Sequence, residues 1–263
     1  MREQTDGALK EKVRAYWNAH PCGTQFSSTE WGTREFFEEA ERVRYTAQPF
    51  MHELAGFDRF SGKQVLEVGC GLGTDLLQFA RGGAHVTGVD LTAQSIELAK
   101  ARFAQQGIPV RALVADAEHL PFEDNSFDVV YSFGVLHHTP NTERAIEEAY
   151  RVLKPGGRII LMLYHKHSLH VYLGVPLFWL SNKLRNNKFS AFEDWIRVYD
   201  GEENPLGKAY SRSEIRGMMR QFSNVTATVY DPIRRRIPQA LNAINQFLFA
   251  RWLGFWVVMK GEK

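Results

Sequence analysis

A glycine-rich turn follows a short apolar run in the first third of the chain. Residues Val65–Asp75 read VLEVGCGLGTD, so a predicted strand leads into three glycines spaced G-x-G-x-G and then into a predicted helix. Such a turn lets backbone N–H groups approach a bound nucleotide closely. A dinucleotide fingerprint, G-x-G-x-x-G, would need glycine where Thr74 or Leu76 stands. The spacing therefore favours a ligand without phosphate groups.

A carboxylate ends the next predicted strand. Asp90 could accept hydrogen bonds from both hydroxyls of a ribose. The structural alternative is a turn that only joins a strand to a helix, with Asp90 as the cap of the following helix. Cys70 lies inside the turn, where a small residue is needed, and we expect it to pack as a small apolar side chain and not to act as a nucleophile.

Histidines and a tyrosine follow two later predicted strands. His137-His138 comes after the fourth strand, and Tyr164–Ser168 comes after the fifth. In open α/β sheets, ligands bind outside the carboxyl ends of the strands. A histidine or a neighbouring tyrosine there could remove a proton from a hydroxyl, thiol or amine. If the strand continues, His165 and His167 share one face and Tyr164 lies on the other.

Alternating strands and helices must position these residues. Strands are predicted at residues 64–68, 85–89, 110–115, 127–133, 158–164, 224–230 and 255–260, and helices at 75–81, 93–105 and 142–153. A capping box at Ser211–Glu214 opens one more helix that ends near Phe222. This alternation predicts an α/β fold, a Rossmann-like, doubly wound sheet of seven strands with helices on both faces.

The predicted core has additions on both sides. Residues 1–60 form an N-terminal helical lid, with helical spacing at Leu9–His20 and Phe36–Leu54. Residues 61–165 form the ligand-binding core, and residues 166–211 form an insertion and loop on the substrate side. Residues 212–263 complete the sheet with a helix and the last strands. Loops over the strand ends of such folds usually carry specificity.

Motifs beyond the glycine turn resemble the class I S-adenosylmethionine-dependent methyltransferases, in particular the small-molecule branch that includes ubiquinone and menaquinone biosynthesis. The matching segments are Asp116-Ala117, Leu120–Phe122, Ser126–Val130, Leu136–His138 and Leu153–Gly157. They occur in the family's order and spacing across about residues 61–165. The resemblance implies S-adenosyl-L-methionine as cofactor and S-adenosyl-L-homocysteine as product.

The resemblance also implies roles for individual residues. The methionine and ribose portions would lie against Glu67, Gly69 and Gly71, the ribose hydroxyls against Asp90, the adenine against Leu91, Asp116 and Ala117, and the methionine ammonium and sulfonium near Ser132 and Phe133. Four residues are the candidate bases that activate the acceptor: Tyr164, His165, His167 and His137. Four more are candidate lid or substrate contacts: Tyr16, Arg42, Tyr45 and Tyr210. For each of these candidate bases and contacts, the alternative is a structural role, in side-chain packing or on the surface.

The acceptor is expected to be a small molecule with a hydroxyl or thiol, which would make the protein an O- or S-methyltransferase. Two alternatives stay open. One is a lipophilic, quinone-like acceptor at a membrane surface, suggested by the apolar stretches 171–180 and 237–256 and the basic run Arg234–Arg236. We favour core helices for these stretches. The other alternative is a regulator that binds the cofactor without catalysing methyl transfer.

Composition excludes several other classes. A net charge of +2 is too balanced for a nucleic-acid binder. The two cysteines predict no disulfide framework, and their spacing with histidines and carboxylates predicts no metal site. The first residues lack a signal peptide, and no apolar run of about 18 residues occurs. These features predict a cytoplasmic protein, and none of them predicts an oligomeric state.

Overall fold

A computed structural model gives the fold and describes residues 2–184, 195–197, 199–231, 244 and 250–263. Its strands are β1 (Gln64–Val68), β2 (His85–Asp90), β3 (Arg111–Val114), β4 (Phe127–Phe133), β5 (Leu153–His165), β6 (Ala209–Tyr210), β7 (Ser223–Tyr230) and β8 (Trp256–Glu262). The α-helices are α1 (Arg2–Ala19), α2 (Arg34–Ala47), α3 (Met51–Ala55), α4 (Thr74–Arg81), α5 (Ala93–Gln105), α6 (Thr142–Val152), α7 (Leu169–Leu184), α9 (Arg212–Met218) and α11 (Ala250–Leu253). Short 3₁₀ turns are η1 (Thr24–Phe26), η2 (Phe57–Phe60) and η3 (Leu136–His138).

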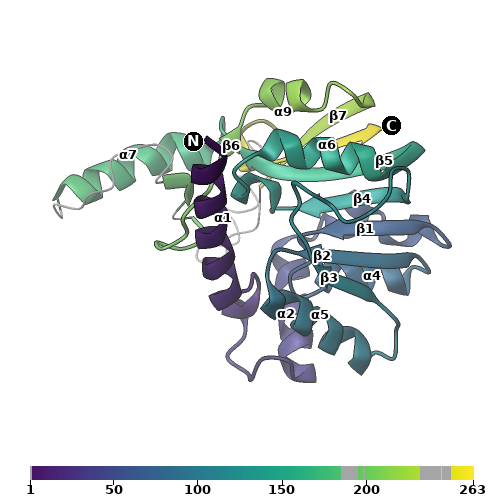
Figure 1. Cartoon of the computed structure of the whole chain (residues 1–263). Coiled ribbons are helices and arrows are strands. Elements are labelled where there is room, and N and C mark those ends of the chain that lie inside the picture. The colour runs from purple at the N-terminus through teal and green to yellow at the C-terminus, as the bar shows by residue number, and fades with distance from the viewer. Residues whose placement is uncertain (1, 185–194, 198, 232–243, 245–249) are drawn as a thin grey trace.

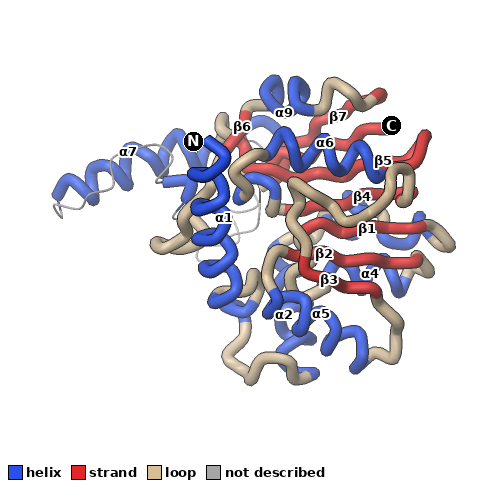
Figure 2. The backbone as a smooth tube through the Cα atoms, viewed as in Figure 1, coloured by secondary structure: helices blue, strands red, loops and turns tan. Residues whose placement is uncertain are grey.

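One twisted sheet runs through the molecule in the order β3-β2-β1-β4-β5-β8-β7 (Figure 2). The strands from β3 to β5 pair in parallel, whereas β8 runs antiparallel to both β5 and β7. All seven predicted strands are present. The additional strand, β6, pairs in parallel with the end of β5 and so ties the long loop before it to the carboxyl edge of the sheet. The predicted Rossmann-like fold is confirmed.

Side chains alternate between two apolar cores because successive residues of a strand point to opposite faces. Val65 of β1 packs with helices α3, α4 and α5, while Leu66 packs with α6 and α9 on the other face. Both faces of the sheet are thus covered, which is why its central strands are nearly continuous apolar runs. The carboxyl ends of the parallel strands are left as the place where polar side chains gather.

Three predicted elements differ in their bounds. The helical spacing at 36–54 is realised as two helices, α2 and α3, because Gln48 precedes Pro49 and leaves the helical region with φ −134° and ψ 61°. Helix α6 ends at Val152, and β5 begins directly afterwards, earlier than predicted. The capping box forms as predicted, but its helix, α9, ends at Met218.

Helix α1 stands across the carboxyl ends of the strands, and α7 projects away from the body of the molecule (Figure 1). None of the described helices combines the length and the apolar character needed to span a bilayer. Most of residues 237–256 and all of Arg234–Arg236, on which the membrane alternative partly depends, lie outside the described residues. The described parts of that alternative are α7, which exposes Tyr172, Leu173 and Leu180, and residues 244 and 250–256, which expose Ile244 and Trp252.

Candidate functional site

The glycine turn forms an open cradle between β1 and α4. Gly69, Gly71 and Gly73 have positive φ angles of 79°, 51° and 70°, conformations that favour glycine. A Cβ on Gly69 would overlap Val135 at 2.3 Å, whereas one on Gly71 would meet only the carbonyl oxygen of Cys22, at 3.9 Å. The backbone at Gly71 therefore faces open space, as a ligand-binding turn requires.

Asp90 lies at the edge of this cradle with its carboxylate fixed. One oxygen accepts a hydrogen bond from the N–H of Gly71 at 3.1 Å, and the other accepts from the N–H and hydroxyl of Thr92 at 3.0 and 2.9 Å. Burial raises the pKa of Asp90, and these hydrogen bonds oppose the rise. Asp90, which is predicted to contact the ribose, is thus hydrogen-bonded to the glycine turn. Its contact with ribose hydroxyls remains a prediction.

Glu67 supplies a second carboxylate beside the turn. Its side chain is 5% exposed, and one carboxylate oxygen has no hydrogen-bond partner among the described residues. Burial, reinforced by the nearby charge of Asp75, raises the pKa of Glu67 well above its usual value. Buried polar atoms nearly always have partners, so an orphaned oxygen here is what a site for a polar ligand would present. The carboxylate oxygens of Asp90 and Glu67, which accept hydrogen bonds, and the open glycine turn together fit S-adenosylmethionine.

Asp75 organises the inner wall of the site. Its buried carboxylate accepts hydrogen bonds from Nε and Nη2 of Arg44, the first at 2.7 Å, and from the hydroxyls of Tyr45 at 2.9 Å and Tyr131 at 2.7 Å. Burial alone would raise the pKa of Asp75, but Arg44 and these hydrogen bonds hold it below its usual range. The sequence analysis missed Asp75 and Arg44. A buried carboxylate in an apolar helix needs a charged partner. Asp75, in the predicted helix after the glycine turn, therefore indicates that an arginine or lysine lies against it.

Helix α1 lies against the residues that are predicted to contact adenine. Nζ of Lys10 lies 2.6 Å from Asp116 and 2.8 Å from Glu118. Burial of Asp116 raises its pKa, but the hydrogen bond from Lys10 and other contacts lower it below the usual value. Leu91 and Ala117, the other predicted adenine contacts, are half-buried. Lys10, like Asp75 and Arg44, is a residue that the sequence does not predict at the site, which makes three.

Ser132 and Phe133 end β4 next to the cradle. The hydroxyl of Ser132 is fully buried and donates to the carbonyl of Val68 at 2.9 Å, so it fixes β4 against β1. The Phe133 ring lies 5.4 Å from the guanidinium carbon of Arg44 and is half-buried. Both residues stand where the prediction placed the methionine portion of the cofactor, and their contacts with it remain predictions.

A cluster of polar rings lies at the ends of β4 and β5. The hydroxyl of Tyr164 is 2.8 and 3.0 Å from the two carboxylate oxygens of Asp200, and its ring packs on His137 at 3.8 Å between centroids with the ring planes tilted by 35°. Nε2 of His138 lies 3.4 Å from Asp200. Burial raises the pKa of Tyr164 well above its usual value and lowers that of His137 well below its own. The sequence predicts Asp200 only as part of the insertion and loop of residues 166–211, without a role of its own.

Two of the four candidate bases lie apart from this cluster. Nδ1 of His165 is 3.0 Å from the carbonyl of Gly254, and burial lowers the pKa of His165 to about 4. His167 is exposed, with Nδ1 2.9 Å from the hydroxyl of Tyr172. Strand β5 ends at His165, so the strand does not continue to His167, and the two rings lie 5.9 Å apart between centroids. Tyr164 and His137, and not this pair, face the Asp200 loop.

Of the four candidate lid residues, two contact the groups described above and two have other partners. The hydroxyl of Tyr16 donates to the backbone carbonyl of Asp200 at 2.8 Å, so it borders the polar cluster. Tyr45 reaches the Asp75 wall, as described above. Arg42 is exposed and paired with Glu39, and Tyr210 donates at 2.8 Å to Thr142 on α6. Among the described residues, the side-chain partners of Arg42 and Tyr210 belong to neither the glycine turn nor the polar cluster, and their contacts with a ligand remain predictions.

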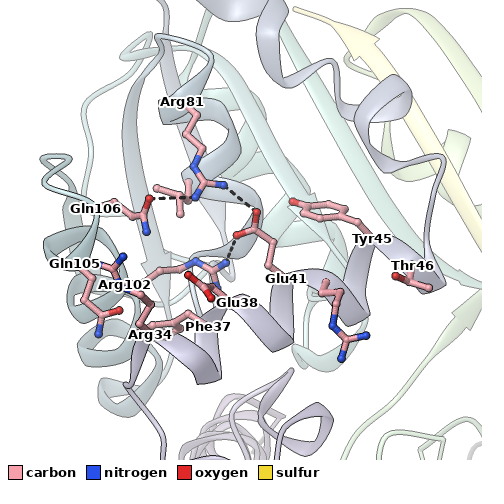
Figure 3. A pocket seen from close by; sticks show the side chains of 12 residues that line it. Arg34, Phe37, Glu38, Glu41, Tyr45, Thr46, Arg81, Arg102, Gln105 and Gln106 are labelled. Atoms are coloured by element: carbon pink, nitrogen blue, oxygen red, sulfur yellow. Dashed lines mark hydrogen bonds and ion pairs between the residues drawn. The ribbon is translucent and has the colours of Figure 1, made fainter.

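A separate pocket of about 670 Å³ lies between α2, α4 and α5 (Figure 3). Glu41 stands between Arg81 and Arg102 and pairs with both. The pocket is lined by helices and not by the carboxyl ends of the strands. The ion pairs of Glu41 with Arg81 and Arg102 bridge its walls, and we place the functional site at the cradle and the polar cluster instead.

The core matches known proteins in sequence. A family model described as a methyltransferase domain matches residues 66–161. The chain is 41% identical over 98 residues to a sterol 4-C-methyltransferase of Caenorhabditis elegans, a match that covers 36% of this chain and 29% of that protein. It is 38% identical over 104 residues to the 27-O-demethylrifamycin SV methyltransferase of Amycolatopsis mediterranei, covering 38% of each. The chain spans less than half the length of the curated relatives it matches.

Solved structures share the fold over a larger part of the chain. A phosphoethanolamine N-methyltransferase 2 from Haemonchus contortus, in complex with S-adenosyl-L-methionine, matches with a TM-score of 0.63 and 19% identity over 95% of this chain and 60% of that one. A geranyl diphosphate C-methyltransferase from Streptomyces coelicolor matches with a TM-score of 0.62 and 16% identity over 97% of each. At these identities the likeness is one of fold.

Proposed function

We propose that the chain, whose residues 66–161 match a methyltransferase domain, is a class I S-adenosylmethionine-dependent methyltransferase that transfers the methyl group of S-adenosyl-L-methionine to a small-molecule acceptor. The observation that carries this proposal is the open glycine cradle at Gly71, flanked by the fixed carboxylate of Asp90 and the unpaired oxygen of Glu67. Two carboxylates around an open turn suit the hydroxyls and the cationic methionine end of this cofactor better than they suit a phosphate.

In this proposal each part of the cofactor has its own residues. Asp90 accepts the ribose hydroxyls, Asp116 and Ala117 border the adenine, and Ser132 and Phe133 border the methionine portion. Glu67, two residues before Gly69, has a carboxylate oxygen without a hydrogen-bond partner among the described residues. When bound, the cofactor supplies an electrophilic methyl group on its sulfonium. Everything else in catalysis falls to the chain: it must orient the acceptor, exclude water and take up the acceptor's proton.

Tyr164 and Asp200 are the proposed route for that proton. Because the pKa of Tyr164 is raised, its phenol is protonated near neutrality and is not a free base. It can still accept a proton from a hydroxyl or thiol while its own proton passes to the carboxylate of Asp200, which it already contacts. His137 borders the same position with both ring nitrogens unused by the described residues. An O- or S-methyltransferase is the function that this polar cluster supports best.

A lipophilic acceptor is the second candidate. Helix α7 projects from the body of the molecule (Figure 1), and its side chains Tyr172, Leu173 and Leu180 are exposed. Large exposed apolar patches often mark contacts with membranes or apolar ligands. Sedimentation with liposomes that contain anionic lipid separates the two candidates. A protein that stays in the supernatant supports the soluble acceptor, and salt-sensitive co-sedimentation would favour the lipophilic one.

Two measurements test the proposed function itself. Titration calorimetry should detect binding of S-adenosyl-L-methionine, and cofactor with a labelled methyl group should label some member of a panel of phenols, alcohols, thiols, amines and quinones. Absence of cofactor binding by the folded protein would overturn the proposal. Binding without transfer to any acceptor would instead identify a regulator.

A further inference from the structure

Three metal-ligating side chains converge at the carboxyl ends of β4 and β5. His137, His138 and Asp200 each offer one donor atom, and the three atoms lie within 4.8 Å of one another. Nε2 of His138 is 3.4 Å from Oδ2 of Asp200. Metal–ligand bonds of about 2.1 Å at a tetrahedral zinc ion place neighbouring donor atoms about 3.4 Å apart. One edge of a coordination polyhedron is therefore already formed.

His137 provides the independent sign of a ligand. Its side chain is 0% exposed, and neither ring nitrogen has a hydrogen-bond partner among the described residues. A buried polar group without a partner is costly unless water or a ligand supplies one. The ring is held in place by packing on Tyr164 at 3.8 Å and on His138 at 4.2 Å between centroids. The structure thus keeps an imidazole rigid and unpaired beside a carboxylate.

The surrounding hydrogen bonds are those that orient metal ligands. Nδ1 of His138 lies 2.6 Å from the carbonyl of Leu206, so it donates there, and in the neutral imidazole Nε2 then directs its lone pair toward Asp200. The hydroxyl of Tyr164 donates to Asp200. Metal-binding histidines usually donate their second N–H to a carbonyl or carboxylate, and ligating carboxylates usually accept a hydrogen bond. Two of the three candidate ligands already have that support.

From this geometry we propose that His137, His138 and Asp200 bind a divalent transition-metal ion of the zinc type. Two imidazoles and one carboxylate suit such an ion better than Mg²⁺, which prefers oxygen ligands. The ammonium of Lys208, which donates to the carbonyls of Thr139 and Pro140, opposes the added positive charge. We therefore expect weaker binding than at a closed site with four protein ligands.

Three protein ligands leave a coordination position open, and this part of the inference rests on the proposed function. An oxygen or sulfur of the acceptor would fill that position, which would narrow the acceptors to molecules with a hydroxyl or thiol. The ion would also lower the pKa of that group and reduce the need for the route through Tyr164 and Asp200. The binding site itself does not depend on the reaction.

The direct test is calorimetry of the full chain, stripped of metal with a chelator and titrated with Zn²⁺. We expect one ion per chain, with affinity at least about 100-fold weaker in His137→Ala, His138→Ala and Asp200→Asn. Tyr164→Phe, which removes only an orienting hydrogen bond, should weaken binding by about 10- to 100-fold. His167→Ala, a histidine on the same segment but outside the cluster, should bind as the parent does, and Mg²⁺ should give no signal.

Co²⁺ provides a readout that needs no folded variant. Bound through two imidazoles and a carboxylate, it should give the parent protein a visible absorption band that excess Zn²⁺ abolishes. No band and no Zn²⁺ heat, or Zn²⁺ binding that survives all three ligand substitutions, would overturn the inference. Binding of S-adenosyl-L-methionine by the metal-free protein is measured alongside. If the metal-free protein does not bind the cofactor, the proposed function is contradicted. If the protein binds no Zn²⁺ but transfers methyl groups at full rate, only the metal-site inference is contradicted.

Discussion

Arg44 in α2 and Asp75 in α4 form a two-pronged ion pair that joins the N-terminal helices to the helix that follows the glycine turn. The pair is reinforced by hydroxyls from Tyr45 and Tyr131, so four hydrogen bonds converge on one buried carboxylate. Through this contact the wall of the cofactor site and its covering helix are parts of one structure. Loss of the carboxylate should therefore affect both stability and cofactor binding.

Asp75→Ala should lower the free energy of unfolding by about 3–5 kcal/mol, because it leaves a guanidinium buried without its partner. Urea denaturation would measure this. Arg42→Ala is the matched control, since Arg42 is exposed on the same helix as Arg44 and its loss should change stability by less than about 0.5 kcal/mol. Equal effects of the two substitutions would show that the ion pair does not support the fold.

The Lys10–Asp116 pair predicts a pH dependence. The pKa of Asp116 in the folded chain is below its usual value, so the folded state binds this proton less readily than the unfolded state does. The stability that the pair contributes is therefore present above the unfolded pKa of about 4 and disappears as the pH falls through the lower folded value. Thermal unfolding of the parent and of Asp116→Asn should differ at pH 7, and the difference should vanish near pH 2. A difference that persists at pH 2 would contradict this assignment.

Asp90→Ala should weaken the binding of S-adenosyl-L-methionine by about 2–4 kcal/mol, since two charge-assisted hydrogen bonds to the ribose are lost. This corresponds to a Kd about 30- to 900-fold higher. Calorimetry measures it, with Glu97→Ala on the exposed face of α5 as the control. A folded Asp90→Ala protein with parental affinity would mean that Asp90 only shapes the glycine turn.

Tyr164→Phe should lower kcat by about 10²- to 10⁴-fold, the usual effect of losing general acid–base help. The Kd for the cofactor should barely change, because the hydroxyl acts on the acceptor. Steady-state rates with the acceptor found in the labelling panel give both values when combined with calorimetry. His167→Ala, with its exposed ring, should retain the parental rate, and the same rate in Tyr164→Phe would leave Tyr164 a packing residue only.

Local patterns were sufficient for the fold and for the cofactor side of the site. The strand around Val65, its glycine turn and Asp90 lie close together in the chain, so their spacing carries the information. The same is true of α6, which is amphipathic and follows the capping residue Asn141. Strand β6 is only two residues long and has no periodicity to detect.

Contacts between distant segments could not be predicted in this way. Arg44 and Asp75 are 31 positions apart, and Lys10 and Asp116 are 106 apart. Asp200 reaches Tyr164 because β6 pairs with the end of β5 and draws its loop inward. His165 and His167 have the residue type expected of a base, yet Nδ1 of His165 contacts the carbonyl of Gly254, 89 positions away, and Nδ1 of His167 contacts the hydroxyl of Tyr172.

The place of β8 in the sheet has a consequence for how the chain folds during synthesis. Strand β8 lies between β5 and β7, so β5 has an unpaired edge along most of its length until residues 256–262 have left the ribosome. An open edge of an apolar strand is prone to pair with another chain. The cofactor cradle, in contrast, is built from segments that emerge much earlier. A nascent chain could thus acquire its ligand-binding half while it still depends on chaperones to shield β5.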